Sequence, residues 1–246
     1  MLDAQVLRVA ASPGSKRLVV ARAGREEHVD ADAILVATGR RPALDRLGLE
    51  SAGVAFDAHG IVVDDHLRTT NPRIYAAGDV ASRFQFTHAA DALARIALQN
   101  ALFFGRKRAS ALHVPWCTYT DPEVAHVGLT SDEARARKGR VRTWTASLGD
   151  VDRAIVDRTT DGFARIHATR RGRILGATLV APHAGESIGE MAIAVTARLR
   201  MKHLLRTIHP YPTVGEIWKK LGDEAFFAKV GPRSRSLAAR FRAWRR

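Results

Sequence analysis

Residues 61–80 read IVVDDHLRTTNPRIYAAGDV, and a helical pattern follows them at once. The apolar start predicts a short strand, Asn71-Pro72 closes a polar turn, and a second strand is expected to stop at Gly78-Asp79. The next stretch places apolar residues at helical spacing and should end at Gly105. These residues are Ala90, Ala94, Ala97, Leu98, Ala101 and Leu102. The resulting order is strand, glycine, acid, helix.

Upstream of this stretch the pattern is that of strands. Residues 5–11 and 17–23 alternate between apolar and polar side chains and are separated by polar turns, which predicts a small antiparallel meander. Residues 33–39, AILVATG, form a continuous apolar run ending at Gly39. We expect this run to be a buried central strand.

Downstream of Leu112 the pattern changes to strands and helices in an α+β arrangement. Residues 114–130 are extended, and a helix is expected to begin with Ser131 as its cap. Three alternating strands are predicted at 141–147, 163–169 and 174–182. An amphipathic helix over 185–201 should bury Ile188, Met191, Ala192, Val195 and Leu199. Prolines 210 and 212 end that helical region, because proline lacks the backbone donor and clashes with the preceding turn.

The composition describes a globular protein with a strongly basic end. The chain has 246 residues and a formal net charge of +14, and residues 217–246 hold half of that excess, with nine Lys or Arg against two acids. Cys117 is the only cysteine, so this sequence contains no disulfide and no dithiol pair. No apolar run reaches the length of a membrane span, and no secretion signal is evident, so a cytoplasmic location is expected.

Four stretches together resemble the class I pyridine nucleotide-disulfide oxidoreductases, on the branch of mercuric reductase and dihydrolipoamide dehydrogenase. They are ADAILVATGRRPAL (31–44), TTNPRIYAAGDV (69–80), FTHAADALARIALQNALF (86–103) and VPWCTYTDPEVAHVGLTSDEA (114–134). The resemblance implies an α/β remnant of FAD- and NAD(P)-binding domains over 1–110. It also implies an α+β dimerisation domain with an antiparallel sheet over 111–228, and leaves a basic tail over 229–246.

On the flavin side, the resemblance assigns contacts with the cofactor to five residues. Asp79 would hold the ribityl chain of FAD, and the helix that begins near His88 would face the flavin ring. A glycine before a carboxylate and a helix N-terminus suit a polyol, since the backbone can approach closely and the carboxylate accepts hydroxyl hydrogen bonds. The expected cofactor contacts are Gly39, Gly78, Asp79, His88 and Ala89.

Two features of the family are missing from the sequence. No two glycines are separated by a single residue, so there is no GxGxxG fingerprint for the FAD pyrophosphate or for NAD(P). Cys117 has no second cysteine with which to form a redox-active disulfide. We therefore expect this chain, by itself, to be inactive and to retain neither FAD nor NAD(P).

Residues 209–216, HPYPTVGE, resemble the family's His-x-His-Pro-Thr-x-x-Glu segment, which completes the active site of the partner subunit in a homodimer. Tyr211 takes the place of the acid/base histidine, and Glu216 that of the glutamate which orients it. A phenol with a pKa near 10 mainly donates hydrogen bonds at neutral pH, unlike an imidazole. The expected catalytic residues are Tyr211, Glu216 and His209, the last either as a substitute base or as a turn residue; no metal site is predicted.

Two other interpretations remain open from the sequence. The chain could be a non-catalytic dimerisation module. Alternatively, the tail stripe of Leu237, Phe241 and Trp244 among arginines could place a flavoprotein fragment on an anionic membrane surface, or could be a solvated terminus. Nothing in the sequence favours nucleic-acid recognition. It also does not identify the substrate or distinguish NADH from NADPH.

Overall fold

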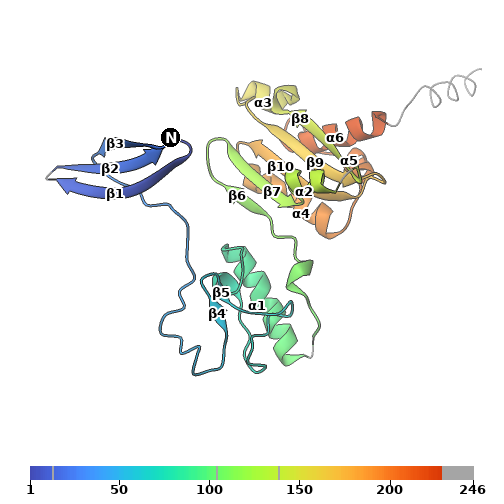
Figure 1. The fold of residues 1–246 in the computed structure, drawn as a ribbon. Coiled ribbons are helices and arrows are strands. Elements are labelled where there is room, and N and C mark those ends of the chain that lie inside the picture. The colour runs from blue at the N-terminus through green and yellow to red at the C-terminus, as the bar shows by residue number, and fades with distance from the viewer. Residues whose placement is uncertain (13, 104, 138, 229–246) are drawn as a thin grey trace, which may run out of the picture. The chain divides into compact units, whose positions relative to one another are not determined.

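A computed structural model describes residues 1–12, 14–103, 105–137 and 139–228. By internal contacts, the chain forms two compact units, Met1–Arg41 and Pro42–Arg246. The first unit is an antiparallel sheet of three strands in the order β1-β2-β3 (Figure 1). These strands are β1 (Ala4–Ser12), β2 (Ser15–Arg22) and β3 (Arg25–Ala31). The predicted meander is confirmed.

The buried strand expected at residues 33–39 is not formed. None of these residues is in a strand, and Leu35 and Val36 are 91% and 77% exposed. A continuous apolar run is buried in a sheet only when strands pair with it and other elements cover both faces of that sheet. In the part of the chain that the structure describes, no strand pairs with this run, so its apolar side chains are not packed into the core of a sheet.

The second unit begins with short elements around one long helix. They are β4 (Phe56–Asp57), β5 (Gly60–Ile61), η1 (Gly78–Val80), α1 (Thr87–Leu102) and η2 (Ala109–Ala111). The prediction of a strand that stops at Gly78 is wrong. Among the described residues, this stretch forms only an isolated β-bridge, between Arg68 and Tyr75. A single bridge holds the segment in place without making a ladder.

The predicted helix at α1 is confirmed, but its buried side is different from the one expected. Leu98 and Leu102 are 56% and 62% exposed, whereas Leu93 and Ile96 pack against Leu67. The predicted stripe consisted mostly of alanines, which bury little area. The larger side chains on the adjacent stripe therefore decide which way the helix faces.

The remainder of this unit is built on a five-stranded antiparallel sheet in the order β6-β7-β10-β9-β8 (Figure 1). Its strands are β6 (Trp116–Thr118), β7 (Glu123–Gly128), β8 (Val141–Ser147), β9 (Phe163–Thr169) and β10 (Ile174–Ala181). The three alternating strands predicted from the sequence are confirmed, and the antiparallel sheet agrees with the expected α+β fold.

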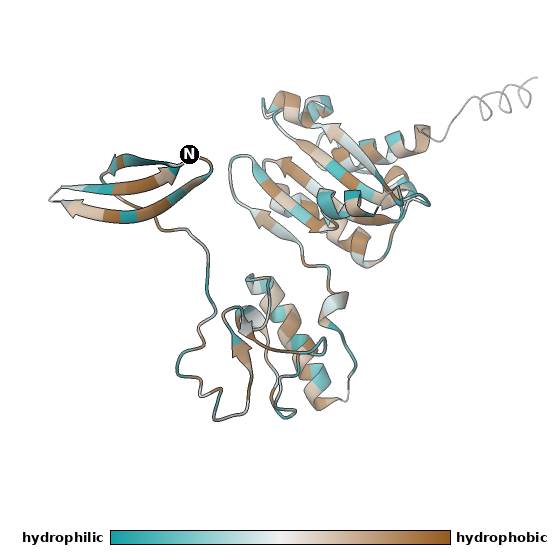
Figure 2. Ribbon diagram, in the orientation of Figure 1, coloured by the Kyte–Doolittle hydropathy of each residue, from teal (hydrophilic) through white to brown (hydrophobic). Residues whose placement is uncertain are grey.

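Helices cover this sheet and enclose its core. They are α2 (Ser131–Ala136), α3 (Asp152–Val156) after η3 (Leu148–Asp150), α4 (Ala184–Thr196), α5 (Met201–Arg206) and α6 (Glu216–Phe227). Helix α4 contacts β6, β7 and β10, and α6 contacts β8 and β9. Hydrophobic residues, brown in Figure 2, recur along these strands and helices. The core contains Ile166, Leu179, Met191 and Trp218, all fully buried.

Two predicted helix boundaries need correction. Thr130, not Ser131, caps α2, because its hydroxyl accepts a hydrogen bond from Glu133 N while the Glu133 carboxylate accepts one from Thr130 N. Helix α4 ends at Thr196, before Leu199. Arg198 adopts a left-handed φ of 55°, and Leu199 N donates back to Ala194 O at 2.8 Å, which closes the helix.

The basic tail with Leu237, Phe241 and Trp244 lies outside the described residues. Within the described ranges, no helix is both long and apolar enough to cross a bilayer.

Candidate functional site

The segment from Thr207 to Gly215 joins α5 to α6 as a tight loop. Thr213 Oγ1 donates a 2.7 Å hydrogen bond to Pro210 O, and the Tyr211-Pro212 peptide bond is cis. Tyr211 is 69% exposed, and its hydroxyl donates to Asp152 Oδ2 at 2.8 Å. Asp152 is the first residue of α3, so the phenol is held by an element 59 residues away in sequence.

The interaction with Asp152 changes the acidity of the phenol. The hydrogen bond to Asp152, followed by the charge of that carboxylate, raises the pKa of Tyr211 above its usual 10. The charge of Glu216 contributes in the same direction. Tyr211 is therefore set to donate a hydrogen bond and not to act as a base.

Substitution of Asp152 by Asn is expected to lower the pKa of Tyr211 toward 10, since the charge that disfavours the phenolate is removed. The measurement is an ultraviolet difference titration, taken against Tyr211→Phe so that the other two tyrosines cancel. Asp157→Asn is the matched control, because Asp157 follows the same helix but pairs with Arg153. A Tyr211 titration unchanged by Asp152→Asn would contradict the assigned cause.

His209 is held by two oxygen atoms of this same chain. Its side chain is 6% exposed, Nε2 lies 3.1 Å from Glu190 Oε1, and Nδ1 lies 3.2 Å from Thr207 O. Both partners are acceptors, so the ring satisfies both bonds only with a proton on each nitrogen. In this conformation both ring nitrogens are engaged by oxygen atoms of this chain.

Glu216 occupies the first position of α6. Its Oε2 atom is buried and has no hydrogen-bond partner among the described residues. A buried polar atom without a partner is costly and uncommon in native structures. His209 and Tyr211 thus lie on the loop and Glu216 on the helix that follows it, but the first two side chains are paired with Glu190 and Asp152 and not with Glu216.

Sequence reasoning did not identify Glu190 or Asp152. Each is distant in sequence from the residue it binds, by 19 and 59 positions respectively. The acidic residues at 186 and 190, one turn apart on α4, are the only local signal for Glu190.

On the proposed flavin side, Gly78 and Asp79 form η1 just before α1. Gly78 has a φ of +81°, and a Cβ there would come within 3.4 Å of Ala90 Cβ, so only glycine suits the position without strain. Asp79 is half-buried, and its carboxylate receives no hydrogen bond or ion pair from the described part of the chain. An accessible carboxylate without an internal partner is available to a hydroxyl-bearing ligand.

The N-terminus of α1, like the carboxylate of Asp79, has no side-chain partner among the described residues. No side chain that the structure describes caps it, and its first turn contains no acid, so no acid or side-chain cap there offsets its backbone N–H groups or the positive end of the helix dipole. Ala89 is 1% exposed, whereas His88 is exposed, stacks on Phe86 and donates from Nε2 to Pro115 O at 2.7 Å. Gly39 belongs to the first unit and has a φ of +109°.

The environment of Cys117 is that of a structural thiol. Burial, followed by the charge of Glu123, raises the pKa of Cys117, and Sγ donates weakly to Glu123 Oε2 at 3.7 Å. The thiolate, which is the reactive form, is therefore disfavoured. Among the described residues, no group of three His, Cys, Asp or Glu side chains is placed to hold a metal ion.

These residues fit one part of FAD. The unpaired carboxylate of Asp79 suits a ribityl chain, and the uncapped start of α1 suits the electron-rich edge of a flavin ring. The sequence offers no matching GxGxxG loop for the pyrophosphate.

Comparison with known proteins identifies the class. Residues 114–221 match the dimerisation domain of the pyridine nucleotide-disulphide oxidoreductases, and residues 1–94 match the pyridine nucleotide-disulphide oxidoreductase family model. The chain therefore belongs to this family of oxidoreductases, whose intact members bind FAD and NAD(P) and whose dimerisation domain forms homodimers.

Among curated relatives, mercuric reductase from Streptomyces lividans is 39% identical over 207 residues, covering 83% of this chain and 44% of that protein. Dihydrolipoyl dehydrogenase from Bacillus subtilis is 37% identical over 209 residues, covering 84% of this chain and 44% of that protein. The chain thus spans less than half the length of these relatives.

Two solved structures are similar at the level of the fold and of the sequence. The HOCl-induced flavoprotein disulfide reductase RclA from Escherichia coli has a TM-score of 0.80 and 28% identity, over 91% of this chain and 51% of that one. LpdA from Mycobacterium tuberculosis has a TM-score of 0.82 and 27% identity, over 90% of this chain and 48% of that one.

Proposed function

We propose that this chain provides the rear portion of a flavin-dependent NAD(P)H oxidoreductase that reduces a disulfide or a metal ion. The observation that carries the proposal is the arrangement around Asp79. Its half-buried carboxylate lacks an internal partner and follows a glycine at positive φ, just before a helix whose start has no side-chain cap. The curated relatives, mercuric reductase and dihydrolipoyl dehydrogenase, correspond to the two classes of substrate.

In the complete enzyme, the flavin would supply two-electron transfer between the nicotinamide and the group to be reduced. Asp79 would accept hydrogen bonds from the ribityl hydroxyls. The first turn of α1, at Thr87 to Ala89, would direct its free N–H groups toward the edge of the ring where negative charge accumulates. Gly78 would allow the backbone close to the cofactor.

The dimerisation domain would complete the reaction cleft of a second subunit. Tyr211, exposed and hydrogen-bonded to Asp152, would donate a hydrogen bond to the substrate or bind a metal ion through its phenol oxygen. Glu216 Oε2 is buried without a partner among the described residues, and the side chain would have to turn outward to accept a proton or a hydrogen bond from the opposite subunit. His209 would need to leave Glu190 before it could act as a base.

We further propose that the chain alone is cytoplasmic, dimeric, inactive and free of FAD and NAD(P). We expect the purified protein to be colourless, without the flavin band near about 450 nm, because the pyrophosphate fingerprint is missing. A stoichiometric flavin spectrum in the purified chain would show this expectation to be wrong.

The role of Asp79 is tested by combining this chain with the front half of a related enzyme. Co-expression with the front half of a related mercuric reductase, which carries the FAD fingerprint and the cysteine pair, is expected to give a yellow complex that oxidises NAD(P)H. Asp79→Ala should reduce its flavin content by roughly tenfold, since charge-assisted hydrogen bonds contribute about 1.5–3 kcal/mol each. Asp91→Ala, which removes an exposed acid paired with Arg95 on α1, is the control and should leave the flavin content unchanged.

A second candidate function is a non-catalytic dimerisation module. It is favoured by the lone Cys117 and by the absence of both nucleotide fingerprints from the sequence. A colourless dimer that gains no flavin in the complementation experiment would support the module over the enzyme portion. The alternative of contact with an anionic membrane rests on residues 229–246 alone, and the comparisons add no support for it.

A further inference from the structure

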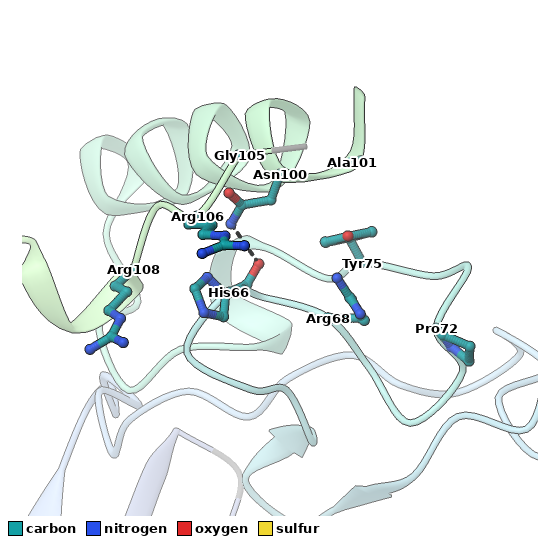
Figure 3. Close-up of a pocket in the computed structure, with 9 residues that line it drawn as sticks. All are labelled: His66, Arg68, Pro72, Tyr75, Asn100, Ala101, Gly105, Arg106 and Arg108. Carbon is teal, nitrogen blue, oxygen red and sulfur yellow. Dashed lines mark hydrogen bonds between the residues drawn. The ribbon is translucent and has the colours of Figure 1, made fainter. Parts of the chain in front are cut away.

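The second unit contains a basic hollow that the proposed function does not use. It has a volume of about 810 Å³ and lies where residues 66–75, the end of α1 and residues 105–108 meet (Figure 3). Its lining includes Arg68, Arg106, Arg108, His66 and Tyr75. Ligand pockets typically measure 300–1,000 Å³, so the hollow is large enough for more than one phosphate group.

A single buried side chain holds the walls of the hollow together. Asn100 is 6% exposed, and its Nδ2 atom donates to His66 O at 3.0 Å and to Lys107 O at 2.9 Å. Its Oδ1 atom accepts from Lys107 N at 3.0 Å. A Cβ on Gly105 would come within 2.9 Å of that oxygen, so the loop needs glycine there. The walls are therefore fixed by three hydrogen bonds and do not depend on a ligand.

His66 is oriented by the same loop. Its Nδ1 atom donates to Lys107 O at 3.0 Å, which fixes the plane of the ring beside Arg106 (Figure 3). Arg68 lies over the ring of Tyr75, with its guanidinium carbon 5.8 Å from the ring centre. The side chains that line the hollow thus supply mostly hydrogen-bond donors, and the hydrogen bonds of Asn100 hold the main chain that bears His66 and Arg106.

The charge of the hollow is not compensated by its own residues. No lining residue is acidic. Asp65 lies 3.9 Å from Arg108 Nε and already accepts two 2.8 Å hydrogen bonds from Ser110, which lower the pKa of Asp65. The Asp64 carboxylate accepts hydrogen bonds from the main-chain N–H groups of His66 and Arg68. Within the described residues, neither Arg68 nor Arg106 forms an ion pair.

The end of α1 gives a competing explanation for these arginines. A helix C-terminus carries about half a negative charge, and basic residues nearby are favoured. The two guanidinium groups without an ion pair among the described residues, those of Arg68 and Arg106, exceed that charge, and the last turn is already closed by Phe103 N and Gly105 N, which both donate to Gln99 O. The excess positive charge calls for an external anion.

We propose that this hollow is a binding site for a small anion with several phosphate groups. Guanidinium groups bind phosphate oxygens through paired hydrogen bonds, and several of them facing one cavity favour a multiply charged ligand over a monoanion. The site does not depend on the proposed flavin function, so either can fail without the other.

Isothermal titration calorimetry of the full chain with inorganic tripolyphosphate tests the site. We expect saturable binding of one tripolyphosphate per chain, and an affinity at least about tenfold weaker in Arg68→Gln/Arg106→Gln, since each charged hydrogen bond contributes about 1.5–3 kcal/mol. The control, Arg137→Gln/Arg140→Gln, removes the same charge from another arginine-lined hollow, of about 660 Å³. It should change the affinity less than about twofold, because screening weakens distant charges.

All four arginines are exposed, and far-UV circular dichroism checks that both variants are folded. Equal weakening by the two double substitutions would overturn the proposal, because it would show attraction to net positive charge and not to this hollow. Unsaturable binding, or binding of several anions per chain with equal affinity, would overturn it as well.

Discussion

Trp218→Ala is expected to lower the free energy of unfolding of the dimerisation domain by about 3–5 kcal/mol, the usual cost of removing a buried aromatic side chain. Trp218 is fully buried on α6, where it packs into the core beneath the five-stranded sheet. Its Nε1 atom donates to Ser187 Oγ at 3.1 Å, which links α6 to α4. Domains of this size are stable by only about 5–15 kcal/mol, so the substitution removes a large share.

Urea unfolding followed by circular dichroism measures this loss. Ser187→Ala should cost only about 1 kcal/mol, the value of one hydrogen bond. Ile193→Ala, on the same helix α4 but 68% exposed, should stay within about 0.5 kcal/mol of the original protein. A loss below about 1 kcal/mol for Trp218→Ala would mean that α6 does not close this core.

The second large effect is a loss of stability in acid caused by His167. This residue is 1% exposed on β9, with Nδ1 at 2.9 Å from Thr143 Oγ1 and Nε2 at 3.4 Å from Ser131 Oγ. Burial, followed by the charges of Arg165, His126 and Arg135, lowers the pKa of His167 from 6.5 to about 4. The folded protein thus keeps the ring neutral where the unfolded chain would protonate it.

The direction in which stability changes with pH follows from the pKa of His167 in the folded and unfolded states. Between pH 6.5 and about 4 the unfolded state binds the extra proton, so stability is full above pH 6.5 and is lost as the pH falls through about 4. The contribution of His167 is on the order of 3 kcal/mol, since each pKa unit corresponds to about 1.4 kcal/mol. Below pH 4 both states are protonated and this contribution no longer changes.

Urea unfolding at several pH values, compared between the original protein and His167→Asn, isolates this effect. Asn keeps a polar group near Thr143 but does not titrate. His126, whose pKa burial also lowers, remains in both proteins. Parallel curves of stability against pH would contradict the assignment.

Elements defined by local patterns were predictable from the sequence. Strands β8, β9 and β10 alternate in side-chain polarity because one face meets the helices, and α1 shows helical spacing along its length. The side of α1 that is buried was not predictable from period alone, because it depends on Leu67, a residue outside the helix. The expected strand at 33–39 failed for a similar reason, since burial depends on partner strands and not on the run itself.

The candidate site, too, was only partly predictable from the sequence. Sequence resemblance selected Tyr211, Glu216 and Asp79, and these assignments remain predictions. The contacts that set their chemistry come from distant elements, such as Asp152 on α3 for Tyr211 and Glu190 on α4 for His209. Such pairs leave no periodic signal, because each depends on how separate helices pack against the sheet.

The uncovered run around Leu35 and Val36 has a consequence for the protein in solution. A stretch of Ile, Leu and Val that is exposed and outside any described strand is a template onto which another extended chain can add. Mutual repulsion from a formal charge of +14 opposes such clustering, and salt weakens that repulsion. Solubility should therefore decline with rising ionic strength, so dilute buffer is the safer medium for storing this protein.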